Sequence, residues 1–265
     1  MRVMAAVLGV PVGLALLVSA CGQPARPAGT SRAHEQRASH TVPQVVAGPV
    51  APDPRVGAVF LGGGDLHTCT GSVLHSSGGD LVLTAAHCLG GNTPPTFVPG
   101  FAGQAAPDDI WTVDAVYLDP RWVAGRDPHA DYAIARVSRP AGGSVEAQAG
   151  SGLSLGNAPA RGSQVRVMAY PAGVGGTPIG CQAGTGVTAD GYPSLPCSGL
   201  VDGTSGAPWI SGSTVIGVIG GLDGGGCGEE LSYSAPFDQH VAQLLARAEA
   251  GGPGDAAAPD FDDGC

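Results

Sequence analysis

A histidine, an acid and a hydroxyl stand in this chain in an order that would allow nucleophilic catalysis. His87 follows a short apolar β-type run, Leu81–Thr84, and its imidazole can gain and lose a proton near neutral pH. Asp131 directly precedes another apolar run and could hold the far ring nitrogen in one tautomer, while Ser205 offers a hydroxyl that the imidazole could deprotonate. These residues are therefore the candidate base, orienting acid and nucleophile.

Three short segments carry a resemblance to a known family. They read Thr-Ala-Ala-His-Cys at 84–88, Asp-Tyr-Ala at 131–133 and Gly-Thr-Ser-Gly-Ala-Pro at 203–208. In this order they resemble the signature blocks of chymotrypsin-like (trypsin-fold) serine proteases, and the similarity spans about residues 50 to 249. Threonine before the serine and Ala207 after the next glycine are closer to bacterial members than to digestive trypsin. The resemblance implies a secreted or membrane-anchored serine endopeptidase that needs no cofactor.

The resemblance also implies a role for each residue. His87 would take the proton of Ser205 as the serine oxygen attacks a peptide carbonyl, and Asp131 would orient the imidazole. The backbone N–H groups of Gly203 and Ser205 would form the oxyanion hole, where glycine fits because a side chain or a fixed negative φ would turn the amide away. Asp127, four residues before Asp131, is an alternative acid that the sequence alone does not exclude.

Two alternative functions fit parts of the same sequence. A protease-fold binding lipoprotein that has lost catalysis would share the fold, but it has no reason to keep His87, Asp131, Ser205 and Gly203 together. An esterase of the α/β-hydrolase class is disfavoured because Gly-Thr-Ser-Gly lacks the Gly-x-Ser-x-Gly elbow, and because that class has the order Ser, Asp, His. Endopeptidase is the preferred prediction, and the inactive binding protein is its alternative.

The substrate pocket is predicted from the same resemblance. Trypsin carries an aspartate six residues before its nucleophile, and the matching residue here is Gly199. Glutamyl endopeptidases use a histidine on the strand after the nucleophile, and the matching stretch here has none. We therefore expect a neutral, apolar or small pocket, with Gly220, Gly221 and Leu222 in its wall.

Trypsin and its vertebrate relatives order the oxyanion segment through an aspartate before the nucleophile, which pairs with a newly formed N-terminal amino group. Here Thr204 occupies that position, and a hydroxyl cannot compensate for burying an ammonium group. We expect hydrogen bonds from Thr204, helped by nearby Asp202, to hold Gly203 in its active conformation from the moment of folding.

Composition independently indicates an all-β fold. With 265 residues, of which 43% are hydrophobic and 13% charged, the chain can form one well-buried domain of about 200 residues plus tails. Its 45 glycines and 23 prolines indicate many turns, and a single amphipathic helix near the end favours a sandwich or barrel. The resemblance narrows this expectation to two six-stranded antiparallel Greek-key β-barrels with a C-terminal α-helix.

Apolar and β-branched runs between turn signals predict the strands. In the first barrel they cover 56–61, 68–74, 81–84, 110–118 and 132–137. After a Gly/Ala/Ser-rich connection, 140–157, the second barrel takes 164–170, 206–210, 214–219 and 231–234. Helical spacing of apolar residues predicts a helix over 237–250 that packs on the second barrel; these residues are Val241, Leu244, Leu245 and Ala248.

The charge of the chain limits its partners. Twelve arginines, no lysine and 22 acidic residues give a net charge of −10. This excess argues against nucleic acid or an anionic membrane surface as a partner. The expected partner is a protein or peptide substrate, and a monomer is the default oligomeric state.

The first residues predict export. Met1–Ala20 combines one charge with an apolar run that is too short for a membrane span but typical of a signal peptide. Val-Ser-Ala-Cys at 18–21 resembles a bacterial lipobox, which implies lipidation of Cys21 and anchoring at the extracellular face of the cell membrane; cleavage near Ala20 is the alternative. Residues 21–48 are predicted to be a disordered tether or a propeptide, 49–250 the protease domain, and 251–265 an acidic Gly/Pro tail.

Cysteine counting agrees with export. Seven cysteines leave six if Cys21 is lipidated, an even number for an oxidising compartment. The resemblance implies a Cys69–Cys88 disulfide beside the catalytic histidine. No Cys-x-x-Cys or His-x-x-x-His spacing indicates a metal site. The other expected pairs are Cys181–Cys197 and Cys227–Cys265, with Cys197–Cys227 as an open alternative.

Overall fold

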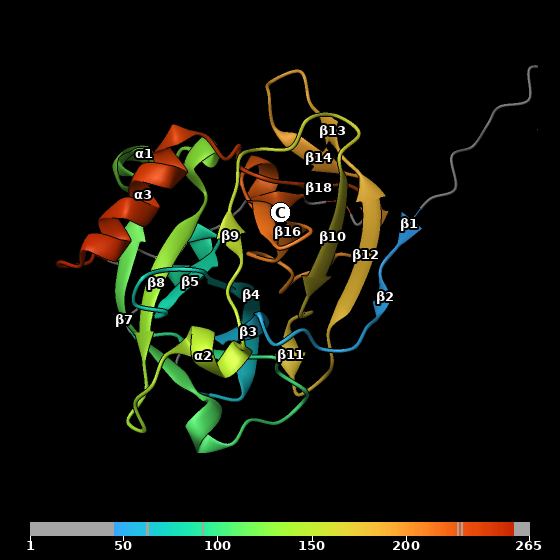
Figure 1. Cartoon of the computed structure of the whole chain (residues 1–265). Helices are drawn as coiled ribbons and strands as arrows, with labels where there is room; N and C mark the ends of the chain where they lie inside the picture. The colour runs from blue at the N-terminus through green and yellow to red at the C-terminus, as the bar shows by residue number, and fades with distance from the viewer. Residues whose placement is uncertain (1–44, 62–63, 92, 227, 229, 257–265) are drawn as a thin grey trace, which may run out of the picture. The chain divides into compact units, whose positions relative to one another are not determined.

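A computed structural model of the chain describes residues 45–61, 64–91, 93–226, 228 and 230–256. The predicted signal peptide, Cys21 and most of the predicted tether lie outside these ranges, as do Cys227 and Cys265. Figure 1 shows a mostly β structure in which short helices and turns join the strands. No helix in the described ranges is long and apolar enough to cross a membrane.

The first half of the fold is a closed antiparallel barrel. Its strands are hydrogen-bonded in the order β4, β3, β6, β7, β8 and β5, and β5 pairs back with β4 to close the ring (Figure 1). This confirms the first predicted six-stranded barrel. Its sixth strand, β6, was not among the strands identified in the sequence, because it is short and lies among prolines. The six strands are β3 (Val56–Phe60), β4 (Leu66–Leu74), β5 (Leu81–Thr84), β6 (Thr96–Pro99), β7 (Trp111–Leu118) and β8 (Ala133–Ser138).

The second half is an open sheet in the described part of the chain, where we had predicted a second barrel. Six strands pair in the order β2, β12, β10, β16, β17 and β9, and three more form a separate sheet in the order β13, β14 and β18. The strands are β2 (Gly48–Pro49), β9 (Ser154–Leu155), β10 (Gln164–Ala169), β12 (Ile179–Gly184), β13 (Gly186–Val187), β14 (Pro193–Leu195), β16 (Pro208–Ser211), β17 (Thr214–Val218) and β18 (Ser232–Tyr233).

The break between the two sheets of the second half falls at Thr185. Thr185 lies between the end of β12 and the start of β13; its N–H donates to the carbonyl of Ser163 at 3.0 Å and its hydroxyl to that of Ala160 at 2.8 Å. Gly184 and Gly186 flank it, and glycine eases such a bend in a strand. The remaining short elements are β1 (Val45–Val46), β11 (Gly173–Val174), β15 (Cys197–Ser198), α1 (Pro120–Gly125), α2 (Val145–Ala149) and 3₁₀ turns at 86–89, 107–109, 128–130 and 222–225.

The apolar core joins the two halves. One cluster of buried side chains takes Leu81, Tyr132 and Ile134 from the first barrel together with Met168 and Ile210 from the second half. Because this cluster spans the junction, loops from both halves are held against one another there. The candidate residues identified in the sequence come from these loops.

The C-terminal helix α3 (Gln239–Ala250) packs on the first barrel, which corrects our prediction. Its buried residues Val241, Leu244 and Ala248 form one stripe that faces β7 and β8 (Figure 1). Polar contacts fix the same placement, since Arg247 donates to the carbonyl of Leu118 at 2.9 Å. Helical spacing identified the buried stripe but carried no information on which barrel would receive it.

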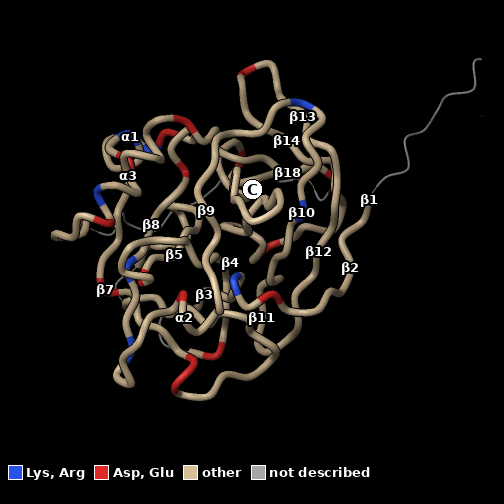
Figure 2. Tube along the Cα trace, viewed as in Figure 1, with Lys and Arg blue, Asp and Glu red and all other residues tan. Residues whose placement is uncertain are grey.

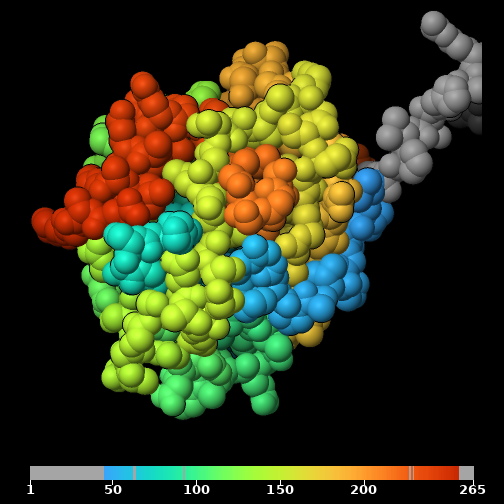
Figure 3. All heavy atoms as spheres, in the orientation of Figure 1, coloured from blue at the N-terminus to red at the C-terminus, as the bar shows by residue number. Residues whose placement is uncertain are grey.

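The N-terminal and C-terminal ends of the described domain both pair with the body of the fold. Val45–Val46 runs parallel to Cys197–Ser198, and Figure 3 shows this N-terminal segment (blue) on the surface of the second half. After α3, the N–H of Asp255 donates to the carbonyl of Val116 at 2.7 Å and its carboxylate accepts from Leu118 N at 2.7 Å. The predicted tether and tail thus each contribute a few ordered residues to the domain.

Candidate active site

His87 and Asp131 form a hydrogen-bonded pair at one end of the first barrel. His87 lies on the 3₁₀ turn that follows β5, and Asp131 lies just before β8. Strand β5 pairs with β8, with Thr84 opposite Ala133, so the pairing brings the two side chains together. Nδ1 of His87 lies 2.8 Å from Oδ2 of Asp131, and the backbone N–H of His87 donates to Oδ1 at 3.1 Å.

Asp131 is buried yet held in its charged form. Its side chain is 1% exposed and that of His87 11%. Burial alone would raise the pKa of the Asp131 carboxyl, but the charge of His87 and the hydrogen bonds from His87 and Gly221 outweigh it, so the pKa lies below its ordinary value. A carboxylate in this position favours the tautomer of His87 that keeps the proton on Nδ1 and leaves Nε2 as a base.

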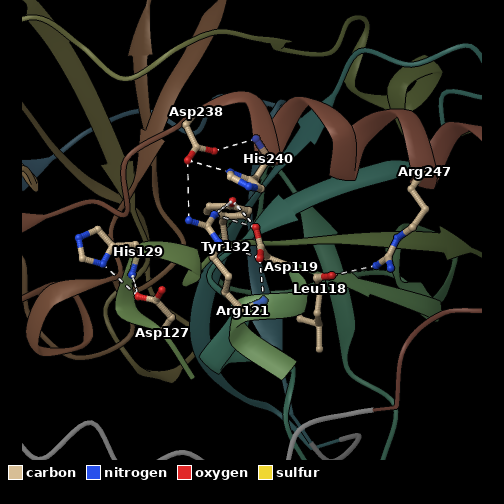
Figure 4. Close-up of polar contacts among 9 residues, drawn as sticks. All are labelled: Leu118, Asp119, Arg121, Asp127, His129, Tyr132, Asp238, His240 and Arg247. Carbon is tan, nitrogen blue, oxygen red and sulfur yellow. Dashed lines mark hydrogen bonds and ion pairs between the residues drawn. The ribbon is translucent and has the colours of Figure 1, made fainter. Parts of the chain in front are cut away.

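Asp127, the alternative acid, lies elsewhere. Its carboxylate caps the 3₁₀ turn 128–130 by accepting from the backbone N–H of His129 at 2.9 Å, and it lies 3.0 Å from Nδ1 of the same residue. Figure 4 shows this local pair of Asp127 and His129. Its side chain is 39% exposed, whereas Asp131, at 1% exposure, is the acid that binds the ring of His87.

Ser205 reaches the same end of the barrel from the second half. Its neighbour Gly206 packs so closely on the segment before His87 that an added Cβ would lie 2.1 Å from Oγ1 of Thr84 and 2.9 Å from N of Ala85. The N–H of Gly206 also donates to the carbonyl of Ile219 at 2.7 Å. The segment after Ile219 then reaches the acid, because the N–H of Gly221 donates to Oδ2 of Asp131 at 2.8 Å.

The backbone at Gly203 has the conformation that only glycine adopts readily. Its φ is +89°, and an added Cβ would lie 2.1 Å from the backbone N of Ala172. The carbonyl of Asp202 accepts from the same N–H of Ala172 at 2.7 Å. Because a trans amide is planar, this bond directs the N–H of Gly203 to the opposite side.

Two backbone N–H groups in the segment around Ser205 are available as hydrogen-bond donors. The N–H of Thr204 donates to the carbonyl of Val201 at 3.1 Å, and the carbonyl of Ser205 accepts from Thr70 N at 2.8 Å. In the described ranges, the N–H groups of Gly203 and Ser205 donate to no protein acceptor. These are the two donors that the sequence predicted for an oxyanion.

A cavity of about 420 Å³ opens beside Ser205. The predicted wall residues Gly199, Gly220, Gly221 and Leu222 do not line it. Gly220 and Gly221 instead face Asp131, where a Cβ on Gly220 would lie 3.0 Å from Oδ2, and this turns them away from the cavity. The lining consists of Pro171, Ala172, Leu200, Val201, Asp202, Thr204, Ser205, Ile219, Asp223, Gly224, Gly225, Gly226 and Gly228.

Two acidic residues lie in the described lining of this cavity, whereas we had predicted a neutral substrate pocket. Asp202 and Asp223 are the charged residues in its described lining. Figure 2 shows the charged residues of the chain dispersed between long uncharged stretches, so two carboxylates at one cavity are a local feature. The sequence could have indicated Asp202, three residues before Ser205, but Asp223 reaches the cavity only through the fold.

Two of the predicted disulfides are present. Cys69 is bonded to Cys88, next to His87, and Cys181 is bonded to Cys197, which excludes the alternative Cys197–Cys227 pair. The sulfurs of Cys69 and Cys88 and a ring nitrogen of His87 lie within 4.8 Å of one another. Because the two sulfurs are bonded to each other, they cannot serve as thiolate ligands.

The fold is that of the chymotrypsin-like serine proteases. The structure is similar to the protease Anisep from Arthrobacter nicotinovorans, with a TM-score of 0.66 and 24% identity over 78% of this chain and 100% of that chain. It is similar to human heparin binding protein, with a TM-score of 0.63 and 16% identity over 80% and 100% of the two chains. A Glu endopeptidase in complex with MPD gives a TM-score of 0.62 and 15% identity over 78% and 98%.

A family model also matches the sequence itself. The model describes the trypsin-like peptidase domain and matches residues 69–218, more than half of the chain. The chain therefore belongs to the trypsin-like peptidase family. No curated protein matches the chain in sequence.

Proposed function

We propose that this protein is a serine endopeptidase in which Ser205 is the nucleophile, His87 the general base and Asp131 the orienting acid. The observation that carries the proposal is the buried carboxylate of Asp131, which binds both ring and backbone of His87. An ion pair on the surface would not need a buried carboxylate with two hydrogen bonds to the same histidine. A histidine that acts as a base does need them, because they fix the direction in which Nε2 points.

The proposed reaction proceeds through an acyl-enzyme. The oxygen of Ser205 attacks the peptide carbonyl carbon while its proton passes to Nε2 of His87, and the negative oxygen that forms is bound by the N–H groups of Gly203 and Ser205. His87 then gives the proton to the leaving amine as the C–N bond breaks. A water molecule, deprotonated by His87, hydrolyses the ester and restores Ser205.

A fluorophosphonate probe tests the nucleophile. The purified domain should be labelled on Ser205, and Ser205→Ala or His87→Ala should abolish both labelling and casein cleavage. Asp127→Asn is the matched control, because it removes a nearby carboxylate that binds His129, and it should leave labelling unchanged. If the wild-type protein is neither labelled nor active at any pH between about 6 and 9, the proposal is overturned.

The alternative is a catalytically inactive binding protein of the same fold. One structurally similar protein is named for heparin binding and not for proteolysis, so likeness of fold does not decide between the two functions. The net charge of −10 disfavours a polyanion such as heparin as the ligand of this chain. Absence of probe labelling in a folded wild-type protein is the result that would favour this alternative.

We further propose that the protein is exported and anchored through a lipid on Cys21, with the catalytic domain at the extracellular face of the membrane. The apolar run before Cys21 and the small residues that directly precede it support this. Cys21→Ser should release the protein from the membrane fraction into the soluble fraction. Unchanged fractionation of Cys21→Ser would contradict the anchor while leaving export open.

A further inference from the structure

Thr70 is a buried polar residue of the first barrel whose contacts converge on the segment that holds Ser205. It lies on β4 directly after Cys69 and is 0% exposed. Its hydroxyl donates to the carbonyl of Gly203 at 3.1 Å, and its backbone N–H donates to the carbonyl of Ser205 at 2.8 Å. One residue of the first barrel thus binds the carbonyl groups of both neighbours of Thr204, Gly203 and Ser205.

The same hydroxyl accepts a bond from a second loop. The N–H of Tyr170 donates to Oγ1 of Thr70 at 2.9 Å, so the hydroxyl uses both its donor and an acceptor site. Two residues later, Ala172 binds the carbonyl of Asp202 at 2.7 Å. The loop after β10 and the segment around Gly203 are therefore tied to each other and to Thr70.

The backbone of Thr70 is itself held in place. Its carbonyl accepts from the hydroxyl of Thr84 at 2.7 Å, and Thr84 lies on β5 just ahead of His87. An added Cβ on Gly206 would lie 2.2 Å from that carbonyl oxygen, so the segment after Ser205 also packs on Thr70. The position of Thr70 is thus fixed relative to the candidate base.

The hydrogen bonds of Thr204 to other described residues are all local. Its hydroxyl donates to the carbonyl of Val201 at 2.7 Å, three residues earlier in the same segment. Such a bond shapes the segment but cannot tie it to the rest of the fold. Asp202, which we expected to help Thr204, accepts a hydrogen bond from Ala172 N through its backbone carbonyl.

We propose that Thr70 is the positioning residue that holds Gly203–Ser205 in the conformation needed to bind the oxyanion; this rests on the proposed function. Without the hydroxyl, the carbonyl of Gly203 and the N–H of Tyr170 would both lose their partner in a buried site. The peptide groups at Gly203 would then gain freedom to rotate, and the N–H of Gly203 would no longer point at a fixed place. Thr70 touches no substrate atom in this role.

Thr70→Val is the direct test, because valine keeps the shape of threonine without its hydroxyl. Loss of a full oxyanion donor typically costs about 10²- to 10³-fold in turnover. Since Thr70 only positions the donor, we expect kcat for a peptide ester to fall about 10- to 100-fold while KM changes less than about threefold. Thr70→Ser should retain kcat within about threefold, because it restores the hydroxyl.

Thr185→Val is the matched control. Thr185 is also a buried threonine, 4% exposed, whose hydroxyl donates to a backbone carbonyl, that of Ala160 at 2.8 Å, but it lies at the bend between two sheets. Thr185→Val should lower the thermal midpoint of unfolding about as much as Thr70→Val does, and it should leave kcat unchanged. A kcat of Thr70→Val within about threefold of wild type, or an equal loss in Thr185→Val, overturns the proposal.

Further measurements distinguish a positioning role of Thr70 from a general loss of stability and from failure of the proposed function. If Thr70→Val does not fold, Thr70→Ala and Thr70→Ser are compared instead, and equal kcat values for these two would overturn the proposal. The pH at which kcat/KM is half-maximal should be unchanged in Thr70→Val, because His87 and Asp131 are untouched. A wild-type protein that fails to react with the fluorophosphonate would instead overturn the proposed function itself.

Discussion

The N–H of Gly221 donates to Oδ2 of Asp131 at 2.8 Å, so the oxygen that faces the ring of His87 is also held by the second half of the chain. Asp131 belongs to the first barrel and Gly221 follows β17. The orientation of the acid therefore depends on the docking of the two halves. The contacts of Thr70 run in the opposite direction, from the first barrel to Gly203 and Ser205. Each half thus fixes the candidate catalytic group of the other.

Replacing Asp131 by asparagine should impair catalysis without removing the side chain. The asparagine would lack the charge that favours the His87 tautomer with a proton on Nδ1, and its amide could donate to that nitrogen instead. We expect Asp131→Asn to lower kcat for a peptide ester by about 10³- to 10⁴-fold, as loss of this charge does in related sites. Asp127→Asn, which removes a carboxylate that binds His129, should change kcat less than about threefold.

A second prediction concerns the acidic cavity beside Ser205. The carboxylate of Asp202 lines it, so a positively charged substrate side chain should be favoured there over a negative one. We expect a higher kcat/KM for an arginine ester than for a glutamate ester, and Asp202→Asn should reduce the ratio of the two by about fivefold. Asp190→Asn, which lies outside the cavity lining, is the control. A glutamate preference in the wild-type protein would contradict this prediction.

A third prediction concerns acid stability and rests on Asp119. This buried carboxylate accepts from N, Nε and Nη2 of Arg121 and from the hydroxyl of Tyr132 at 2.7 to 3.0 Å (Figure 4). Burial by itself would raise the pKa of Asp119, but the bonds from Arg121 and Tyr132 lower it to about 2. Because the folded pKa lies below the ordinary value, the group stabilises the fold above about pH 4 and loses this effect as the pH falls toward 2.

Asp119→Asn tests this contribution. We expect it to lower the free energy of unfolding by about 2 kcal/mol near neutral pH, since it removes the charge from a buried ion pair. The difference from wild type should shrink as the pH falls from about 5 to 2, in urea unfolding followed by fluorescence. Asp114→Asn, which removes an exposed carboxylate from β7, controls for the general loss of a charge. A difference that stays constant down to pH 2 would sink the assignment.

The sequence predicted the candidate acid, base and nucleophile because each lies in a short segment with a recognisable pattern. Gly203 and Ser205 were predicted as candidate oxyanion donors for the same reason, and their N–H groups donate to no acceptor among the described residues. The role of Thr70 could not, because its hydroxyl meets Gly203 and Tyr170, which are 133 and 100 residues away along the chain. No local pattern distinguishes a threonine with such contacts from one that merely fills a strand.

The prediction of the fold was limited in the same way. Long alternating or apolar runs identified most strands of the first barrel, whereas two-residue strands such as β2 and β9 carry no pattern of their own. Gly220 and Gly221, which we expected in the wall of the substrate pocket, do not line the cavity beside Ser205 but turn toward Asp131, a contact that depends on how the halves dock. The barrel on which α3 packs could not be predicted either, because it depends on contacts with residues far away along the chain, such as the bond from Arg247 to the carbonyl of Leu118.

The last prediction is that activity does not depend on a newly formed N-terminus. Thr204 is 2% exposed and its hydroxyl and N–H both bind the carbonyl of Val201, so the position before the nucleophile offers no charge to pair with an amino group. The segment Val45–Val46 is instead paired with Cys197–Ser198, and the N–H of Ala47 donates to the carbonyl of Ser198 at 2.8 Å.

Proteins that begin at Gly22 and at Val45 should therefore turn over a peptide ester at rates within about threefold of each other. A protein that begins at Ala51 lacks β1 and β2, so it should unfold at a lower temperature because their pairing with β15 and β12 is lost. Its turnover per folded molecule, counted by titration with the fluorophosphonate, should match the others. A rise of about a hundredfold or more on trimming to one defined N-terminus would mean that the new amino group orders the oxyanion segment. That outcome would also remove the need for Thr70 as its principal support.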